Sequence, residues 1–305
     1  MASQSQDYNT EGWVRNDSEV GKVLGELKYP VFRYAGTAIR GSGRGKTIKT
    51  WKIVKQVAGR HIERNQGSVG SCVAFGLAGA ADALRCIQIV QKKTGEEFRA
   101  PLSPEYFYGA SRVEIGQGQL AGSDGSLGAW AIRAYQEYGS LLQQRYGSVD
   151  LRKYDERRCR TWGENGVPDE LEQTGREHPL ITASQVGSFD ECMDIYANGG
   201  VCTFASDLGL TNKRDAEGFL HKSGRWAHQM YGIGAKDDRR PGILFDNSWS
   251  FKWVSGPRPD DIPPGSGWVD AKHVDWACLS GDCWGIVSAR GWRPQLLDLS
   301  DWGEA

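Results

Sequence analysis

The chain has 305 residues, of which 39% are hydrophobic, and this is enough for a sizeable core in one large domain or two smaller ones. Its net charge of -1 provides no overall field that would attract nucleic acid or an anionic membrane. The seven cysteines are odd in number and include no CxxC pair, which argues against a disulfide framework and a zinc ribbon. Function must therefore be sought in local motifs of a globular protein.

The N-terminal residues 1–58 are predicted to form an extension with mixed polar composition. They do not begin with the charged and then apolar layout of a secretory signal, and we identify no apolar run that approaches the length of a membrane span. We therefore expect a cytoplasmic protein, or one that assembles from the cytosol, without a membrane partner.

A basic stretch lies between Arg40 and Arg64, where eight Lys or Arg stand against the single acidic Glu63. Single-strand binders interleave such charges with aromatic side chains, whereas this stretch has only Trp51. We interpret it as a solvated face beside an acidic neighbour and expect no nucleic-acid partner.

Helices dominate the elements predicted for the first half of the chain. Apolar residues between 47 and 57 have a loosely strand-like spacing. A small, apolar, helix-favouring run begins at Cys72, and Ser103 followed by Pro104 is typical of a capped helix start. After a glycine-rich loop, residues 129–135 have the pattern of a second amphipathic helix.

Strands dominate the last third. Residues 145 to about 180 are dense in Arg, Glu, Asp, Gly and Pro, which predicts a surface insertion. A short helix at 188–196 leads into a strand at 201–204, and residues 226–234 and 242–249 have the pattern of a β-hairpin. A helical half followed by a sheet half, without βαβ alternation, predicts an α+β fold of two lobes.

Cys72 is the first candidate for chemistry. At the start of a helix, the unsatisfied N–H groups and the positive end of the dipole favour a thiolate, which is a nucleophile. The alternative interpretation is a buried structural cysteine at a helix start.

A cysteine nucleophile needs a base, a group that orients the base, and donors for the developing oxyanion. His228 lies within a strand pattern, and Asn247 lies on the paired strand, where its carbonyl can accept the imidazole N–H. Gln66 precedes Cys72 by six residues, within reach of the same oxyanion. Taken alone, the histidine would be interpreted as a satisfied core residue and the asparagine as an ordinary turn residue.

Three motifs, in this order, resemble those of the papain family of cysteine peptidases. They are Gln66-Gly67-x-x-Gly70-Ser71-Cys72-x-Ala74-Phe75, Ala227-His228-x-x-x-x-Gly232-x-Gly234 and Asn247-Ser248-Trp249. The separation of the Cys and His motifs exceeds the roughly 130–150 residues expected, and the charged insertion accounts for the excess. The resemblance implies a helical lobe with a central helix starting at Cys72, and an antiparallel, β-barrel-like second lobe.

The resemblance also divides the chain. It implies an extension at 1–58 and a papain-like catalytic domain at 59–305. Within that domain we expect a helical lobe at about 59–145, the insertion at about 145–180 and a β-rich lobe at about 181–305.

Carried over by position, Cys72 corresponds to the nucleophile, His228 to the acid and base, Asn247 to the orienting residue and Gln66 to the oxyanion-hole amide. Further positions correspond to the substrate cleft. These are Asp124, Gly125 and Ser126 in a loop that pairs with an extended substrate, Ala227 near the scissile bond, Trp249 shielding the His and Asn hydrogen bond, and Trp253 on the leaving-group side.

No metal or cofactor is expected. His273, Cys278 and Cys283 are close in sequence, but their spacing matches no common metal site.

The chain departs from the family pattern at several positions. Val69 and Ser123 stand where the family usually carries two disulfide-bonded cysteines, which agrees with a reducing compartment. Val73 replaces a tryptophan after the nucleophile, and Ser126 replaces a glycine in the substrate loop. The extension is also shorter than the usual inhibitory pro-segment.

Three hypotheses follow from these residues. The first is a cysteine endopeptidase that hydrolyses polypeptides through a thioester on Cys72. The second is a non-catalytic role in a larger assembly, such as a bacterial virus particle or another intracellular bacterial complex, which the insertions and twelve tryptophans motivate. The third is transfer of the thioester's acyl group to an amine.

Overall fold

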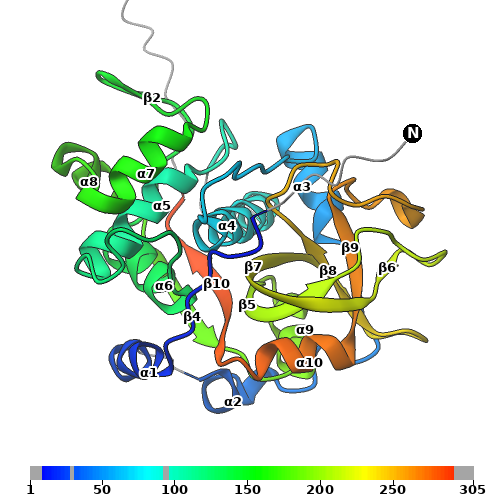
Figure 1. Ribbon diagram of the computed structural model, residues 1–305. Coiled ribbons are helices and arrows are strands. Elements are labelled where there is room, and N and C mark those ends of the chain that lie inside the picture. Colours follow the sequence, from blue (N-terminus) through cyan, green and yellow to red (C-terminus); the bar gives the residue numbers. More distant parts are fainter. Residues whose placement is uncertain (1–8, 28–30, 92–95, 292–305) are drawn as a thin grey trace, which may run out of the picture.

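The computed structural model describes residues 9–27, 31–91 and 96–291. These residues form a mostly helical lobe and a lobe built on a sheet, with a long helix between them (Figure 1). The predicted α+β fold with two lobes is therefore confirmed.

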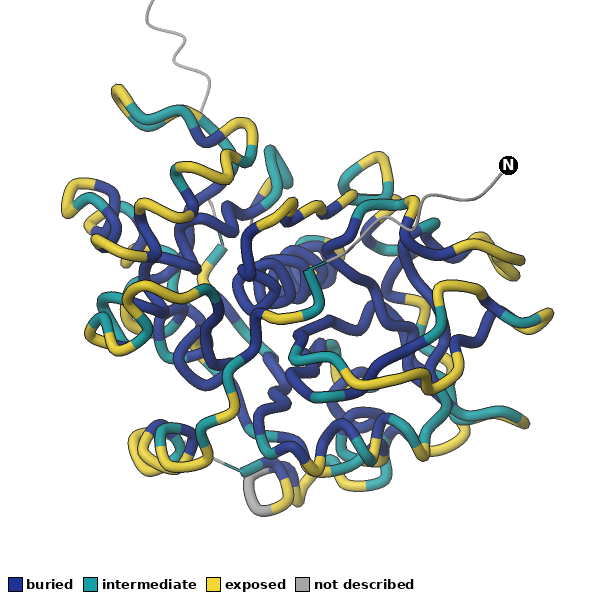
Figure 2. Tube along the Cα trace, in the orientation of Figure 1, coloured by how far each residue is buried: buried dark blue, intermediate teal, exposed yellow. Residues whose placement is uncertain are grey.

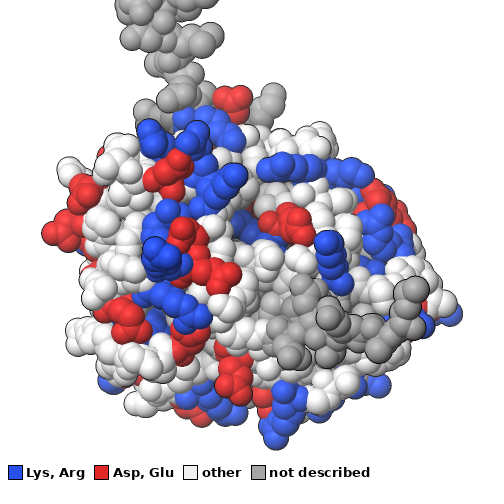
Figure 3. Space-filling model, turned by 45° about the horizontal axis from the view of Figure 1, so that its top comes forward, with Lys and Arg blue, Asp and Glu red and all other residues white. Residues whose placement is uncertain are grey.

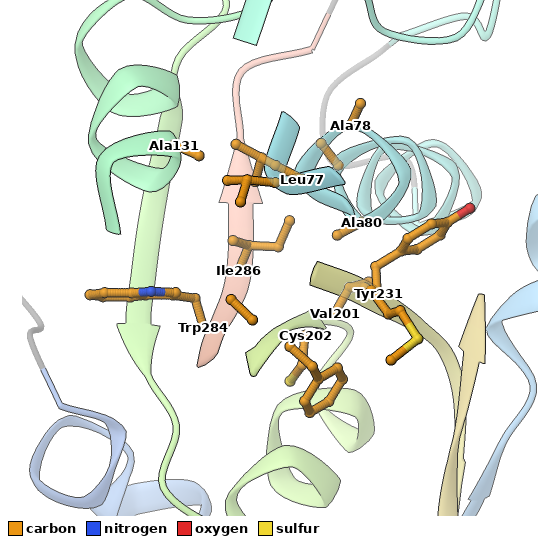
Figure 4. Close-up of a cluster of buried hydrophobic side chains, with 14 of the residues drawn as sticks. Leu77, Ala78, Ala80, Ala131, Val201, Cys202, Tyr231, Trp284 and Ile286 are labelled. Carbon is orange, nitrogen blue, oxygen red and sulfur yellow. The ribbon is translucent and has the colours of Figure 1, made fainter. Parts of the chain in front are cut away.

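The central helix is α4 (Cys72–Val90), and it begins at the predicted residue. Its small apolar residues allow close packing, so that Leu77 and Ala80 lie near Ile286 and Tyr231 of the sheet lobe (Figure 4). Figure 2 shows the helix as dark blue, buried chain at the centre of the molecule.

The same helix corrects one sequence-based expectation. By length and composition alone α4 is able to cross a membrane, so the expectation that no run approaches such a length was wrong. The helix packs inside the protein, with 89% of its most apolar window buried, as in the core helix of a globular domain.

The helical lobe surrounds one side of α4. The Ser103 side chain accepts a hydrogen bond from the Tyr106 N–H and caps the helix that follows it, as predicted. The lobe contains α5 (Pro104–Gly109), the π-helical η2 (Ala110–Ile115), α6 (Gly128–Glu137), the short strands β2 (Arg145–Tyr146) and β3 (Val149–Asp150), α7 (Glu156–Asn165) and α8 (Asp169–Gly175).

The second lobe is an eight-stranded sheet among the described residues, in the order β4-β10-β5-β7-β8-β9-β6, with β1 paired to β7. The predicted hairpin forms, with Tyr231 opposite Asp246, and only β6 and β9 pair in parallel within the described sheet. The order does not return to its first strand, so the sheet is open, and the expected barrel-like form is only approximate. The strands are β1 (Thr47–Ile48), β4 (Leu180–Gln185), β5 (Val201–Leu210), β6 (Phe219–Leu220), β7 (Lys222–Lys236), β8 (Gly242–Asp246), β9 (Ser266–Asp270) and β10 (Asp282–Ala289).

Short helices complete the sheet lobe. Figure 1 shows α9 and α10 together beside the sheet, and both pack against β5. They are α9 (Phe189–Ala197), α10 (Ala271–Cys278) and the 3-10 turn η3 (Pro259–Asp261).

The N-terminal residues pack against both lobes. Trp13, Val20, Val23, Trp51 and Val54 are all buried in the core. The division of the chain at residue 58 remains a prediction. The elements in this part are α1 (Asp17–Glu26), α2 (Phe32–Ala35), the 3-10 turn η1 (Thr37–Ile39) and α3 (Thr50–Ala58).

The strand expected between residues 47 and 57 was wrong beyond its first two residues. Only β1 is a strand, and α3 follows it directly. Trp51 and Val54 are three residues apart, which places both on the helix face that packs against α4.

The basic stretch does lie beside an acidic neighbour. Lys49 and Lys52 pair with Asp260, at 2.5 and 2.7 Å, and Lys55 pairs with Asp261 at 2.5 Å. On the face drawn in Figure 3, Lys and Arg are interspersed with Asp and Glu. The charges of this stretch are thus partly neutralised by the loop that contains η3.

Candidate active site

Cys72 is the first residue of α4, and its side chain is fully buried. Its Sγ accepts a hydrogen bond from the Gln229 backbone N–H at 3.4 Å. Burial raises the pKa of the thiol to about 12, although backbone N–H groups at the helix start act in the opposite direction. The sequence-based expectation of a thiolate at the helix start is therefore outweighed by burial in this conformation.

His228 lies on β7 and is held by Asn247, which directly follows β8. The distance from His228 Nε2 to Asn247 Oδ1 is 2.7 Å, and the same oxygen accepts the Ser248 backbone N–H at 2.7 Å. Because an amide oxygen only accepts, Nε2 carries the proton and Nδ1 is left as the basic nitrogen. Burial lowers the pKa of His228 to about 4, so the imidazole is neutral at pH 7.

The structure thus brings the predicted base and its orienting residue together. His228 Nδ1 has no hydrogen-bond partner among the described residues, and the hydrogen bond to the Cys72 sulfur comes from the next residue, Gln229. Cys72 and His228 are therefore neighbours without a direct hydrogen bond in this conformation.

Three indoles form a cluster beside the imidazole. The Trp249 ring lies 4.4 Å from that of His228, between centroids, and the Trp253 ring lies 5.6 Å from Trp249. Both side chains are buried, and Trp249 is the indole that lies directly against the imidazole. Trp226, which the sequence analysis did not single out, lies 4.8 Å from Trp249. Trp226 and His228 are two residues apart on β7 and therefore lie on the same face of the strand. This two-residue spacing could have identified Trp226 as a site residue from the sequence.

The Gln66 side-chain amide links the loop before Cys72 with the residue that follows Asn247. One N–H donates to the Val69 carbonyl at 2.9 Å, and its oxygen accepts the Ser248 hydroxyl. One of the two Gln66 side-chain N–H groups, which were expected to bind an oxyanion, is thus bonded to the loop that precedes Cys72. The side chain remains fully buried six residues before Cys72.

The cleft above Cys72 contains the protein's own N-terminal segment, residues 10–14. On one side, the Ala227 N–H donates to the Thr10 carbonyl at 2.9 Å, and the Ala227 carbonyl accepts the N–H groups of Gly12 and Trp13 at 2.8 and 2.9 Å. On the other side, Ser126 donates to the Gly12 carbonyl at 3.1 Å and accepts the Val14 N–H at 2.9 Å. Ser126 and Ala227, two of the six predicted substrate-cleft positions, therefore bind a polypeptide backbone. Figure 1 shows this segment crossing the end of α4.

Gly12 lies directly against the Cys72 side chain. A Cβ atom at this residue would lie 2.8 Å from Cys72 Sγ and 2.7 Å from the Gly70 carbonyl oxygen. Only glycine fits in this position without displacing the segment, and the segment accounts for the burial of the thiol. The sequence analysis did not predict this contact, because no local pattern marks a single glycine in an extended segment.

Comparison with known proteins finds similar solved structures but no match by sequence. No protein-family model and no curated protein matches the chain. Among solved structures, it is similar to xylellain, a cysteine protease from Xylella fastidiosa, with a TM-score of 0.55 and 15% identity over 94% of this chain and 99% of xylellain. The chain has the papain-like fold.

Two pro-forms show the same likeness. The procathepsin B S9 of Trypanosoma congolense has a TM-score of 0.52 and 13% identity, covering 92% of this chain and 86% of that one. The procathepsin L2 of Tenebrio molitor larval midgut has a TM-score of 0.52 and 13% identity, covering 94% and 80%. At these identities the likeness establishes the papain-like fold, and it confirms the resemblance that the motifs indicated.

Trp13 fills a pocket in the papain-like cleft. Its side chain is 5% exposed, and its indole N–H donates to Asp282 Oδ2 at 2.6 Å. Asp282 also accepts the backbone N–H groups of Gly128 and Ala129, at 2.8 and 2.7 Å, at the start of α6. Neither Trp13 nor Asp282 was predicted, since the pocket joins residues from opposite ends of the chain.

The remaining predicted loop residues have supporting contacts. Asp124 Oδ2 accepts the Gly70 N–H at 2.8 Å, and the Gly125 carbonyl accepts a hydrogen bond from the buried Arg112. These contacts shape the loop beside the cleft, whereas Ser126 is the loop residue that binds the segment in the cleft.

The positions considered for a metal lie elsewhere. Cys278 ends α10 and Cys283 lies on β10, both buried. Within residues 9–27, 31–91 and 96–291, no group of three or more His, Cys, Asp or Glu side chains could hold a metal ion.

Proposed function

We propose that the protein is a papain-like cysteine peptidase whose cleft is occupied, in this conformation, by its own N-terminal segment. One observation carries the proposal: an extended backbone pairs with Ser126 and Ala227 on the two sides of Cys72. Main-chain pairing of this kind recognises a polypeptide of almost any sequence. A polypeptide is therefore the substrate class that suits the cleft.

The proposed reaction begins when residues 10–14 leave and a substrate takes their place. His228 Nδ1 accepts the Cys72 proton, and the sulfur attacks a peptide carbonyl carbon. The oxyanion is stabilised by the Cys72 backbone N–H and the Gln66 amide. The C–N bond then breaks, the imidazolium protonates the departing amine, and the acyl group remains on sulfur as a thioester.

Water completes the cycle. His228 takes a proton from water, whose oxygen attacks the thioester carbonyl, and the C–S bond breaks. The acyl group departs as a carboxylic acid, and the proton returns to the Cys72 sulfur. Asn247 keeps the imidazole oriented in both halves, while Trp249 excludes water from their hydrogen bond.

Burial explains why this conformation is a resting one. The neutral thiol and neutral imidazole are both favoured, because the pKa of Cys72 is raised to about 12 and that of His228 is lowered to about 4. Admitting water and a substrate to the site removes much of that burial. The two pKa values then approach each other, and proton transfer from sulfur to nitrogen becomes accessible.

The non-catalytic hypothesis differs in one respect that can be measured. In that case the segment at 10–14 is a permanent part of the core, and Cys72 never reacts. A cytoplasmic location and association with a virus particle or another assembly likewise remain proposals.

The deciding experiment uses full-length protein in which Trp13→Ala loosens the segment, with Trp13→Ala/Cys72→Ser as the matched control. We expect hydrolysis of an unfolded polypeptide by the first protein and none by the second. An added amine that appears covalently attached to the products would identify acyl transfer instead. Absence of both hydrolysis and labelling of Cys72 by a peptidyl electrophile would leave only the non-catalytic role.

A further inference from the structure

Helix α7, in the charged insertion, contacts the loop that leads to the nucleophile. Glu156 Oε2 accepts the Ser68 backbone N–H at 3.1 Å and also the Ser68 hydroxyl. Arg160 Nη2 donates to the Ser68 carbonyl at 3.3 Å. Just before the helix, the Tyr154 hydroxyl donates to the Gln66 carbonyl at 3.1 Å. The loop at 66–70 is therefore bound at its backbone by side chains that lie about ninety residues later in the chain.

The same helix also reaches a second loop, at residues 122–126. Arg160 Nη1 lies 3.0 Å from Asp124 Oδ1 and 3.2 Å from its Oδ2. Asp124 Oδ2 in turn accepts the Gly70 N–H at 2.8 Å. Asp124 and Arg160 thus connect the loop at 66–70 with the loop at 122–126.

The loop is shaped to fit α7 closely. Gly67 has a φ of +62°, and a Cβ atom there would lie 2.0 Å from Glu156 Oε1. A residue with a side chain here would have a strained backbone and would displace the Glu156 carboxylate from its contact with Ser68. This close approach indicates a specific contact between loop and helix.

All seven cysteines are free, so no disulfide joins the two connected loops, which contain Val69 and Ser123. We propose that Glu156, Arg160 and Asp124 form a polar brace in which α7 holds both loops in register. They are positioning residues, because they act on Cys72 through the backbone of Ser68 and Gly70, and on Ser126 through the loop that contains Asp124. The role in peptide capture rests on the proposed peptidase function.

The first test of the brace measures the backbone mobility of the loops at 66–70 and 122–126 in the full-length protein. We expect Arg160→Ala and Glu156→Gln to increase amide hydrogen exchange in residues 66–70 and 122–126 together, by about 10-fold, with α4 unchanged. Arg157→Ala is the matched control, since it removes an exposed arginine from the same helix. Unchanged exchange in both loops for both variants would overturn the brace.

Labelling kinetics provide a second test, which a merely structural role does not affect. In full-length Trp13→Ala protein, Cys72 is labelled with a peptidyl electrophile and, separately, with iodoacetamide. We expect Arg160→Ala to lower the ratio of the two rates by about 10-fold, and Asp124→Asn, which keeps an acceptor for Gly70, to lower it less than Asp124→Ala.

Two outcomes of this labelling count against different proposals. An equal fall in both rates would indicate general destabilisation and overturn the positioning role. If the Trp13→Ala reference shows no preference for the peptidyl electrophile over iodoacetamide, the proposed peptidase function fails, and with it the brace's role in peptide capture.

Discussion

Gly12 lies directly against the sulfur of Cys72, so closely that a single added carbon would lie 2.8 Å from it. This contact joins the N-terminal segment to the nucleophile and explains why a helix-start cysteine has a raised pKa. The segment both fills the cleft and removes the water that would stabilise a thiolate. Its displacement is therefore the step that would generate a reactive site.

We predict that Gly12→Ala displaces the segment, because the new Cβ would clash with Cys72 Sγ and the Gly70 carbonyl. Overpacking of this kind costs about 1–3 kcal/mol. The rate of Cys72 alkylation by iodoacetamide at pH 7.5, followed by peptide mass spectrometry, should rise by about 10-fold or more, since 1.4 kcal/mol corresponds to a factor of ten.

Gly21→Ala is the control for that variant. Gly21 lies within α1, and a Cβ atom there would meet nothing within 4 Å. Alanine in a helix is more favourable than glycine by up to about 1 kcal/mol, so this variant should be as stable as the original or slightly more so. Equal alkylation rates for the two variants would show that Gly12 does not seal the nucleophile.

The indole N–H of Trp13 gives a second prediction. Trp13→Phe retains an aromatic ring but loses the hydrogen bond to buried Asp282, which should cost about 1–3 kcal/mol of unfolding free energy. Trp13→Ala also loses the burial of the ring and should cost about 3–5 kcal/mol. Urea unfolding of the two variants measures both costs.

Chemical rescue distinguishes a specific pocket from general destabilisation. In Trp13→Ala, 3-methylindole should refill the pocket and slow the alkylation of Cys72. The matched 1,3-dimethylindole lacks the N–H that Asp282 accepts and should protect much less. Equal protection by both compounds would mean that the hydrogen bond to Asp282 contributes little.

Local sequence patterns predicted those parts of the fold that depend on neighbouring residues. The helix start at Cys72, the cap at Ser103 and the hairpin that carries His228 form as expected. The second strand of that hairpin ends at Asp246, so Asn247 follows the strand and does not lie on it as predicted. The prediction was wrong for residues 50–58 because their apolar spacing is mixed. Trp51 and Ile53 are two residues apart, as in a strand, whereas Trp51 and Val54 are three apart, as in the helix that forms.

The contents of the cleft lay beyond such patterns. The hydrogen bond between Trp13 and Asp282 joins residues 269 positions apart in the sequence. The hydrogen bond between Ser68 and Glu156 joins residues 88 positions apart. Contacts of this kind depend on tertiary packing, which no local periodicity encodes. The motifs singled out Ser126 and Ala227, whereas the segment that binds them emerged only from the fold.

The pKa of His228 links the closed site to the pH dependence of stability. Burial lowers this pKa to about 4 in the folded protein, against 6.5 for an ordinary histidine. Between these values the unfolded chain binds the proton and the folded chain does not. The contribution of His228 to stability is therefore fully present above pH 6.5 and is lost as the pH falls towards 4.

We predict that this loss amounts to about 3 kcal/mol of unfolding free energy between pH 7 and pH 4. His228→Gln removes the titrating group and leaves the other histidines in place, so the difference between the two proteins isolates the effect of His228. Urea unfolding at half-unit pH intervals should show that difference shrinking as the pH falls. A difference that stays constant over this range would mean that His228 titrates normally in the folded protein, and that the segment at 10–14 does not exclude water from it.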